Sequence, residues 1–321
     1  MALHIHRNEL ASEIRLVDKH LPELAFLAPD FRDACSRDKF VQADASKERK
    51  SLILNRGFVL FCSALREGEG EQRVVLIVKT SATDFYLEFL PRIFDRQGGK
   101  EFDYVFNCGG ETRYSQEDEV YRVRSLGLSL LIGREAARRK VKCFVEFSTG
   151  MVYKPDAAPR QESDRLKPWL KLAKWKLQAE EDLAKIEGLN LVVLRLAHVY
   201  GPYTSKFLAT ALCMARVYKE LGKEMKWLYD KDLRTNTVHV EDVSTAAWTA
   251  AEWAAQREQK NTPAVFNIVD HGNTCKLGSN RNSRILQISA NVSCFLCQQP
   301  KASCQALYTM YLEFQRAFRV P

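Results

Sequence analysis

The sequence predicts an α/β fold built on a parallel β-sheet. Two apolar runs, over 141–153 and 189–202, flank a helical pattern over 168–181. Two parallel strands need such a helical crossover between them. The length of 321 residues suffices for one large domain with a smaller cap. No apolar run approaches the ~20 residues that a membrane-spanning helix needs, so no membrane partner is expected.

Four motifs follow one another in the second half of the chain. They are Thr149 four residues before Tyr153, Lys176-Leu177 with Glu180 in the helical pattern, Arg-Leu-Ala-His-Val-Tyr-Gly-Pro at 195–202, and Val-His-Val-Glu-Asp-Val at 238–243. In this order they resemble the motifs of the extended short-chain dehydrogenases, the NAD-dependent epimerase/dehydratase family.

The resemblance implies a Rossmann-type doubly wound parallel sheet with a small C-terminal substrate lobe. It also implies an NAD(P)-dependent epimerase, dehydratase or reductase that transfers hydride at a hydroxyl or ketone of a small molecule. The expected parts are an incomplete NAD(P)-binding domain over 1–202, a substrate lobe over 203–270 interleaved with the last strands, and an atypical tail over 271–321.

A short apolar run at 14–18 ends in Asp18. In the family the second strand ends in such an acid, whose carboxylate accepts hydrogen bonds from the adenosine ribose. Asp18 therefore favours NAD over NADP. Lys19 argues for NADP, because its ammonium could meet a 2′-phosphate. Asp18 could instead begin an ordinary turn before Pro22.

The glycine-rich turn of the family is missing before Asp18. It is expected roughly 25 residues upstream, whereas seventeen residues precede Asp18 and none of them is glycine. Backbone N–H groups of this turn hold the cofactor pyrophosphate in the family. The chain is therefore expected to lack the first strand of the fold and to begin inside its first helix.

The third strand is expected at 40–44, with Asp44 near the adenine. The stretch over 46–90 is longer than the single helix that the family has there, and we interpret it as an atypical insertion. Within it, 57–62 and 73–78 have the composition of strands. They form an added hairpin at the sheet edge, or they are non-native coding sequence such as a retained intron. The sequence leaves both alternatives open.

A fourth strand is expected at 102–107, followed by Cys108, Gly109 and Gly110. Small residues at this point of the family fold let the middle of the cofactor approach the backbone. The helix expected over 115–140 contains no Asn, although the family carries one there to brace the catalytic lysine.

The catalytic pattern of the family differs here at one position. Tyr and Lys at i and i+4 share one helix face, where the ammonium lowers the phenol pKa. A Ser or Thr from the preceding strand, here Thr149, holds the substrate oxygen. Lys176 is present, but Leu172 replaces the Tyr, and leucine transfers no proton.

Three interpretations of this helix remain. In the first, Lys176 clamps the nicotinamide ribose of a cofactor bound without turnover, as in a non-catalytic binding or scaffold protein. In the second, Tyr153 replaces the missing phenol. In the third, Lys174 and Lys176 are solvated charges on an amphipathic helix.

The resemblance also places Ala197 and Val199 at the nicotinamide pocket, with His198 between them as a buried structural residue. Sugar-nucleotide members carry an arginine four residues before the His of the last motif, where this chain has Thr235, and Arg234 lies one residue away. A sugar nucleotide is therefore not favoured, and a steroid-like or small carbonyl substrate remains open.

The composition argues against other classes of protein. The net charge of +8 comes without a basic stripe interleaved with aromatic residues, so no nucleic-acid partner is expected. The nine cysteines, without a secretory signal, indicate reduced thiols in the cytoplasm. A single Cys294-x-x-Cys297 pair is weak support for zinc, so no metal is expected. The expected partners are a small-molecule substrate and a second copy of the chain in a homodimer.

Overall fold

The computed structural model of the protein describes residues 1–18, 22–25, 27–42, 72–79, 90–91, 93–95, 101–156, 159–204, 208–224, 235–258 and 262–270. The chain divides into two compact units. The first consists of Met1–Leu196 and Ser244–Ile268, and the second of Ala197–Val243 and the residues from Val269 onward.

The first unit is built on a sheet that has seven strands in the described part of the chain. All neighbouring strands are parallel. In spatial order the strands are β2 (Phe40–Gln42), β1 (Glu13–Asp18), β3 (Arg73–Lys79), β4 (Tyr104–Asn107), β5 (Cys143–Thr149), β6 (Leu191–Leu196) and β9 (Ala264–Ile268). This arrangement confirms the predicted α/β fold with a doubly wound parallel sheet.

Strand β3 occupies an unexpected position in the sheet. It lies between β1 and β4, and its Val74 and Val75 are both fully buried. The expectation of a hairpin at the sheet edge is therefore wrong for this strand. In the usual order 3-2-1-4-5-6 of such folds, the place between strands 2 and 4 belongs to the first strand. Here β3, which comes third along the chain, takes that place.

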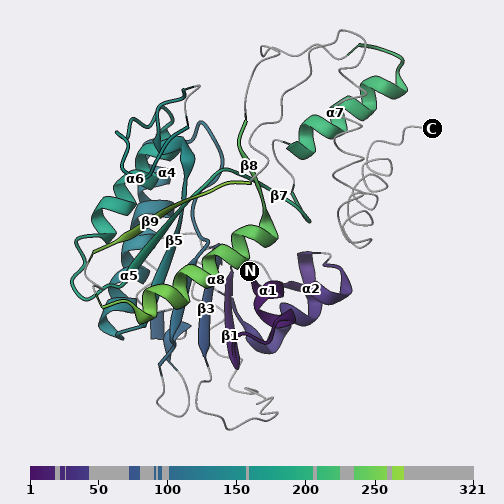
Figure 1. Ribbon diagram of the computed structural model, residues 1–321. Helices are drawn as coiled ribbons and strands as arrows, with labels where there is room; N and C mark the ends of the chain where they lie inside the picture. Colours follow the sequence, from purple (N-terminus) through teal and green to yellow (C-terminus); the bar gives the residue numbers. More distant parts are fainter. Residues whose placement is uncertain are drawn as a thin grey trace. The chain divides into compact units, whose positions relative to one another are not determined.

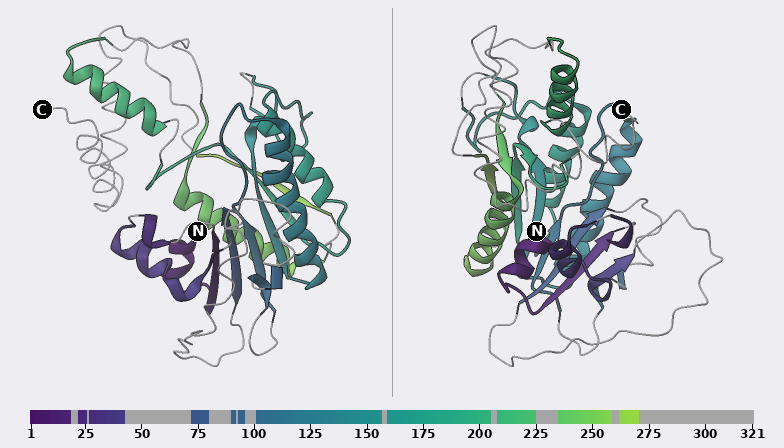
Figure 2. Two further views of the ribbon diagram at one scale, coloured as in Figure 1. Left: turned by 180° about the vertical axis from the view of Figure 1, so that it is seen from behind. Right: turned by 90° about the vertical axis from the view of Figure 1, so that its right-hand side faces the viewer.

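Apolar side chains alternate along the strands and build one core on each face of the sheet. One core contains Val105 and Phe144 and is covered by helices α5 (Leu128–Arg138) and α6 (Lys171–Leu183). The other contains Phe106 and Val145 and is covered by α1 (Ala2–Arg7) and α8 (Val240–Gln256). Figures 1 and 2 show α5 and α6 on one side of the sheet and α8 on the other.

A glycine sets the distance between the two helices of the first face. A Cβ on Gly133 of α5 would lie 2.5 Å from Cδ2 of Leu183 in α6, so a larger residue would push the helices apart. Because α6 carries Lys176, this contact also positions the candidate site. Further helical segments in the described part of the first unit include η1 (Pro22–Ala25), α2 (Pro29–Ala34), η2 (Arg37–Lys39), α4 (Asp118–Tyr121), η4 (Arg122–Gly127) and η5 (Gly150–Val152).

The second unit contains α7 (Leu208–Glu220) and a small parallel sheet of β7 (His198–Tyr200) and β8 (Thr237–His239) in its described part. Asp270 stabilises β8. Its carboxylate accepts hydrogen bonds from the backbone N–H of His239 at 3.1 Å and from Oγ1 of Thr237 at 3.0 Å. The predicted strand at 57–62, Asp44, Arg234, Cys294, Cys297 and the tail over 271–321 lie outside the described residues.

Candidate functional site

Predicted cofactor and catalytic residues of the first unit lie at or next to strand ends. Asp18 is the last residue of β1, Asn107 ends β4 just before Cys108, and Thr149 ends β5. Because these strands run parallel, their carboxyl ends lie at the same edge of the sheet. Ligands of open α/β sheets bind in the crevice outside this edge. Asp18 is half-buried there.

Lys176 meets the glycine turn that follows β4. Its side chain is buried, and Nζ lies 3.5 Å from the point that a Cβ on Gly110 would occupy. Nζ donates hydrogen bonds to Oε1 of Glu146 at 3.0 Å and to the carbonyl oxygen of Phe147 at 2.8 Å. An ammonium has three N–H donors, and these two are the acceptors that the described residues provide. The third N–H has no acceptor among the residues that the structure describes. Lys176 is not a solvated charge of a helix surface.

The charge of Lys176 is balanced by the fully buried carboxylate of Glu146. Besides the lysine, this carboxylate accepts hydrogen bonds from Nδ2 of Asn107 at 2.6 Å and from Oγ of Ser129 at 3.0 Å. A buried charge is tolerated when it is paired and hydrogen-bonded in this way. The Asn expected in the helix over 115–140 is absent. Asn107 and Ser129 hold the lysine in its place, through their hydrogen bonds to Glu146.

The glycine turn itself is held by hydrogen bonds to its backbone. The N–H of Gly109 donates to Oδ1 of Asn107 at 3.2 Å, and the N–H of Glu111 donates to Oγ of Ser125 at 3.0 Å. Gly110 has φ +139°, a conformation that residues with a side chain rarely adopt. Ser125 lies in η4, a π-helical segment, and such segments often occur at functional sites.

The carboxylate of Glu111 anchors the loop that follows. It accepts hydrogen bonds from Nε and Nη2 of Arg113 at 3.0 and 2.8 Å, and from Nη1 of Arg124 at 3.3 Å. The hydrogen bonds from Arg113 lower the pKa of Glu111 to about 2. The Glu111 carboxylate is therefore ionised at neutral pH, and its charge is balanced by the two arginines.

Thr149 and Tyr153 lie close in sequence but have different surroundings. Oγ1 of Thr149 accepts a hydrogen bond from the N–H of Met151 at 3.2 Å, which caps η5. The hydroxyl of Tyr153 is buried, accepts a hydrogen bond from Nη1 of Arg195 at 2.7 Å and donates one to Oδ1 of Asn267 at 2.9 Å.

Arg195 connects Tyr153 to a second buried acid. Its Nη2 donates to Oε2 of Glu180 at 2.7 Å, and its guanidinium stacks 5.2 Å from the centre of the Tyr153 ring. The other carboxylate oxygen of Glu180 accepts a hydrogen bond from Oγ of Ser148. The motif residues Tyr153, Glu180 and Arg195 therefore form one buried cluster that joins the segment after η5 to α6 and β6, and Ser148 connects it to β5.

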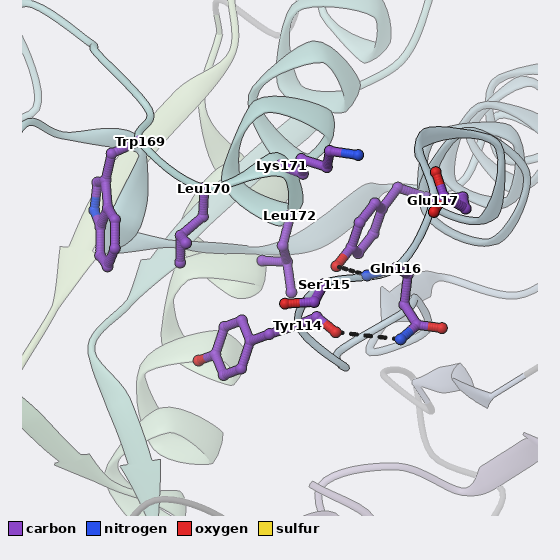
Figure 3. Close-up of a pocket in the computed structure, with 9 residues that line it drawn as sticks. Tyr114, Ser115, Gln116, Glu117, Trp169, Leu170, Lys171 and Leu172 are labelled. Atoms are coloured by element: carbon purple, nitrogen blue, oxygen red, sulfur yellow. Dashed lines mark hydrogen bonds between the residues drawn. The ribbon is translucent and has the colours of Figure 1, made fainter.

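Leu172, at the place of the missing phenol, lines a pocket of about 400 Å³ (Figure 3). The pocket is formed by two segments, 114–117 with Tyr121 after β4, and 169–172 at the start of α6. Because Leu172 and Lys176 are four residues apart in one helix, they share a helix face. The pocket and the buried lysine are thus neighbours along α6.

Ala197 and Val199 belong to the second unit. Ala197 lies between β6 and β7, and the side chain of Val199 in β7 is exposed. His198 is half-buried, and burial lowers its pKa.

In the described ranges, no group of three or more His, Cys, Asp or Glu side chains could hold a metal ion. Among the helices that the structure describes, none combines the length and the apolar character needed to span a membrane.

The chain is similar to proteins of one family. A model of the NAD dependent epimerase/dehydratase family matches residues 92–268. A search of curated proteins found no match.

Solved structures share the fold. The enzyme WbmG of Bordetella bronchiseptica, in complex with NAD and UDP, is 18% identical over 69% of this chain and 70% of its own, with a TM-score of 0.52. A UDP-galactose 4-epimerase is 17% identical over 72% of this chain and 77% of its own, also with a TM-score of 0.52.

Proposed function

Since the chain belongs to the NAD dependent epimerase/dehydratase family, we propose that it is an NAD-dependent enzyme that acts on a hydroxyl or ketone of a small molecule. The observation that carries this proposal is the meeting of Lys176 with the turn at Gly110, because it puts a buried ammonium beside backbone without side chains at the carboxyl edge of the sheet. The similar structure of WbmG holds NAD and UDP, which supports a dinucleotide and a small substrate as ligands.

The described residues at this edge fit the two riboses of a dinucleotide. Gly109 and Gly110 leave the backbone after β4 open to close approach, and the remaining N–H of Lys176 suits a ribose hydroxyl. Asp18, at the end of β1, suits the hydroxyls of the adenosine ribose, and its negative charge disfavours a 2′-phosphate. We therefore propose NAD over NADP. The nicotinamide would supply the acceptor or donor of the hydride.

The chain's own residues would bind and orient the substrate. The hydroxyl oxygen of Thr149 accepts its hydrogen bond from Met151, so its O–H is available to donate to a substrate oxygen. The Lys176 charge stays at a fixed place because Glu146 and Phe147 hold it. Preorganised donors of this kind need no rearrangement when charge develops on the substrate oxygen.

The proton of the substrate hydroxyl needs an acceptor other than residue 172. The sequence indicates Tyr153 as a candidate for this acceptor. Its hydrogen bonds with Arg195 and Asn267 favour a structural role instead. A non-catalytic protein that binds NAD is the second candidate function. Leu172 and the missing glycine-rich turn before Asp18 are the observations that favour it.

Two measurements separate these functions. Titration with NADH and NADPH, followed by nicotinamide fluorescence, is expected to show tighter binding of NADH. Absence of NADH binding would refute both candidate functions. Incubation with NADH and a panel of ketones is expected to consume NADH. Tight NADH binding without turnover over the panel would support the non-catalytic protein.

A further inference from the structure

Two large aromatic side chains are exposed at the pocket beside Leu172. The side chain of Trp169 is 56% exposed and that of Tyr114 is 51% exposed. They come from segments far apart in sequence, yet both line the same pocket. Figure 3 shows them on one side of the view with Leu170, while Gln116, Glu117 and Lys171 lie on the other side.

Apolar surface left in water is unfavourable in proportion to its area. A ligand ring placed against Trp169 and Tyr114 would remove that surface from water. Aromatic rings also gain from offset or edge-to-face contact beyond their buried area. The volume of about 400 Å³ is in the range of small-molecule sites.

The charges of the pocket disfavour an anionic ligand. Its one lysine, Lys171, already has an acidic partner, because its ammonium lies 3.1 Å from Oδ2 of Asp118. Glu117 adds a carboxylate to the wall. A nucleoside diphosphate carries negative charges that need unpaired cations, and the lining residues offer none.

Two of the polar side chains of the wall, those of Gln116 and Tyr121, are engaged in hydrogen bonds within the protein. The N–H of Gln116 donates to the hydroxyl of Tyr121 at 3.3 Å, and Nε2 of Gln116 donates to the carbonyl oxygen of Tyr114 at 3.2 Å. The Tyr121 hydroxyl in turn donates to the carbonyl oxygen of Arg113 at 2.7 Å. Leu172 adds an apolar side chain where the family has a phenol. Together with Trp169, Leu170 and the ring of Tyr114, it forms an apolar part of the wall that suits an apolar ligand.

We propose that this pocket binds an uncharged substrate with an apolar ring system, stacked on Trp169 and Tyr114, and that it does not bind a sugar nucleotide. The inference rests on the proposed function, because it takes the pocket as the substrate site of an NAD-dependent enzyme. It names the substrate class: a neutral ketone or alcohol that carries a fused or aromatic ring.

The test uses the full chain without cofactor, so that its outcome is independent of NADH binding. 2-Acetylnaphthalene, a neutral ring ketone, and UDP-glucose are titrated by calorimetry. We expect the ketone to bind, and Trp169→Ala and Tyr114→Ala each to weaken its binding about tenfold. Trp253→Ala is the control, because Trp253 is also about half exposed but does not line the pocket.

Both substituted residues are exposed, so the variants are expected to keep the thermal midpoint of the unsubstituted chain within a few degrees. The proposal is overturned if the ketone does not bind, or if its affinity is the same in the Trp169 and Tyr114 variants as in the control. It is also overturned if UDP-glucose binds and either pocket variant weakens that binding. NADH titration of the same variants remains a separate test of the proposed function.

Discussion

The ammonium of Lys176 lies 3.0 Å from a carboxylate oxygen of Glu146, whose side chain has no exposed surface. Removing two charges from water is costly, and the cost is offset here by the pairing and by hydrogen bonds from Asn107 and Ser129. The lysine is therefore fixed between β5 and the glycine turn after β4 before any ligand arrives. This preorganisation is the central feature of the candidate site.

The pairing predicts a large effect of removing one partner. Glu146→Gln leaves the Lys176 charge buried without its counter-charge, and we expect the free energy of unfolding to fall by about 3–5 kcal/mol. In the double variant Glu146→Gln/Lys176→Met, no unpaired charge remains, so most of the loss should be recovered. Urea unfolding of the two single variants and the double variant measures the coupling. Strictly additive losses would contradict the pairing.

The conformation of Gly110 predicts a combined effect on stability and binding. Gly110→Ala places a methyl group about 3.5 Å from Nζ of Lys176. The positive φ of this position makes a residue with a side chain unfavourable by roughly 1–2 kcal/mol. We expect lower stability and at least tenfold weaker NADH binding. Gly188→Ala is the matched control, because Gly188 also has positive φ, but its Cβ would meet nothing within 4 Å.

The Gly188 variant should also lose stability, because its φ of +76° is unfavourable for a residue with a side chain, and it should retain NADH affinity. If NADH affinity is retained in the Gly110 variant as well, the turn after β4 is not part of the cofactor site.

The low pKa of Glu111 predicts an acid-dependent loss of stability. The pKa of Glu111 is about 2 in the folded protein, against the ordinary glutamate value of 4.5. The contribution of the ionised carboxylate to folding stability is therefore complete above about pH 4.5 and is lost as the pH falls toward 2. The shift corresponds to at most about 3 kcal/mol, and screening at the exposed Arg113 reduces this to roughly 1–2 kcal/mol.

Glu111→Gln should therefore lower stability at neutral pH and flatten its dependence on pH between about 4.5 and 2. Denaturant unfolding at a series of pH values measures both effects. Glu119→Gln serves for comparison, since Glu119 forms an exposed pair with Arg122 that should contribute little. Equal pH profiles for the two variants would count against the buried role of Glu111.

The cluster of Tyr153, Arg195 and Asn267 predicts a structural role for the phenol. Tyr153→Phe leaves Oδ1 of Asn267 without its donor and removes an acceptor from Arg195. We expect a loss of about 1–3 kcal/mol in stability, with NADH affinity unchanged. Loss of turnover at unchanged stability would instead assign the acid/base role to this phenol.

Much of the sheet could be predicted from the sequence because apolar runs and the crossover helix define it. The position of β3 was missed, although its run of Val, Leu and Ile without alternation is typical of a strand buried on both faces. Val74 and Val75 belong to the cores of opposite faces. That pattern favours the interior of a parallel sheet over an edge hairpin.

The candidate site was predictable in part. Lys176 and Gly110 were expected near the cofactor from the resemblance, and the structure brings them together. Glu146 was missed, because one acid within an apolar strand does not reveal its partners. Its contacts come from Asn107, Ser129 and Lys176, on three other elements, and only the packing of α5 and α6 on the sheet brings them to one carboxylate.

The most direct test of this account is the affinity for NADH with and without the buried ammonium. The double variant Glu146→Gln/Lys176→Met removes the ammonium without leaving an unpaired buried charge, and Lys174→Met removes an exposed charge two residues away on the same helix. We predict that NADH binds the unsubstituted chain and Lys174→Met equally, within about twofold, and the double variant at least tenfold more weakly. Equal affinity of all three proteins would show that Lys176 does not hold the cofactor and would contradict the account.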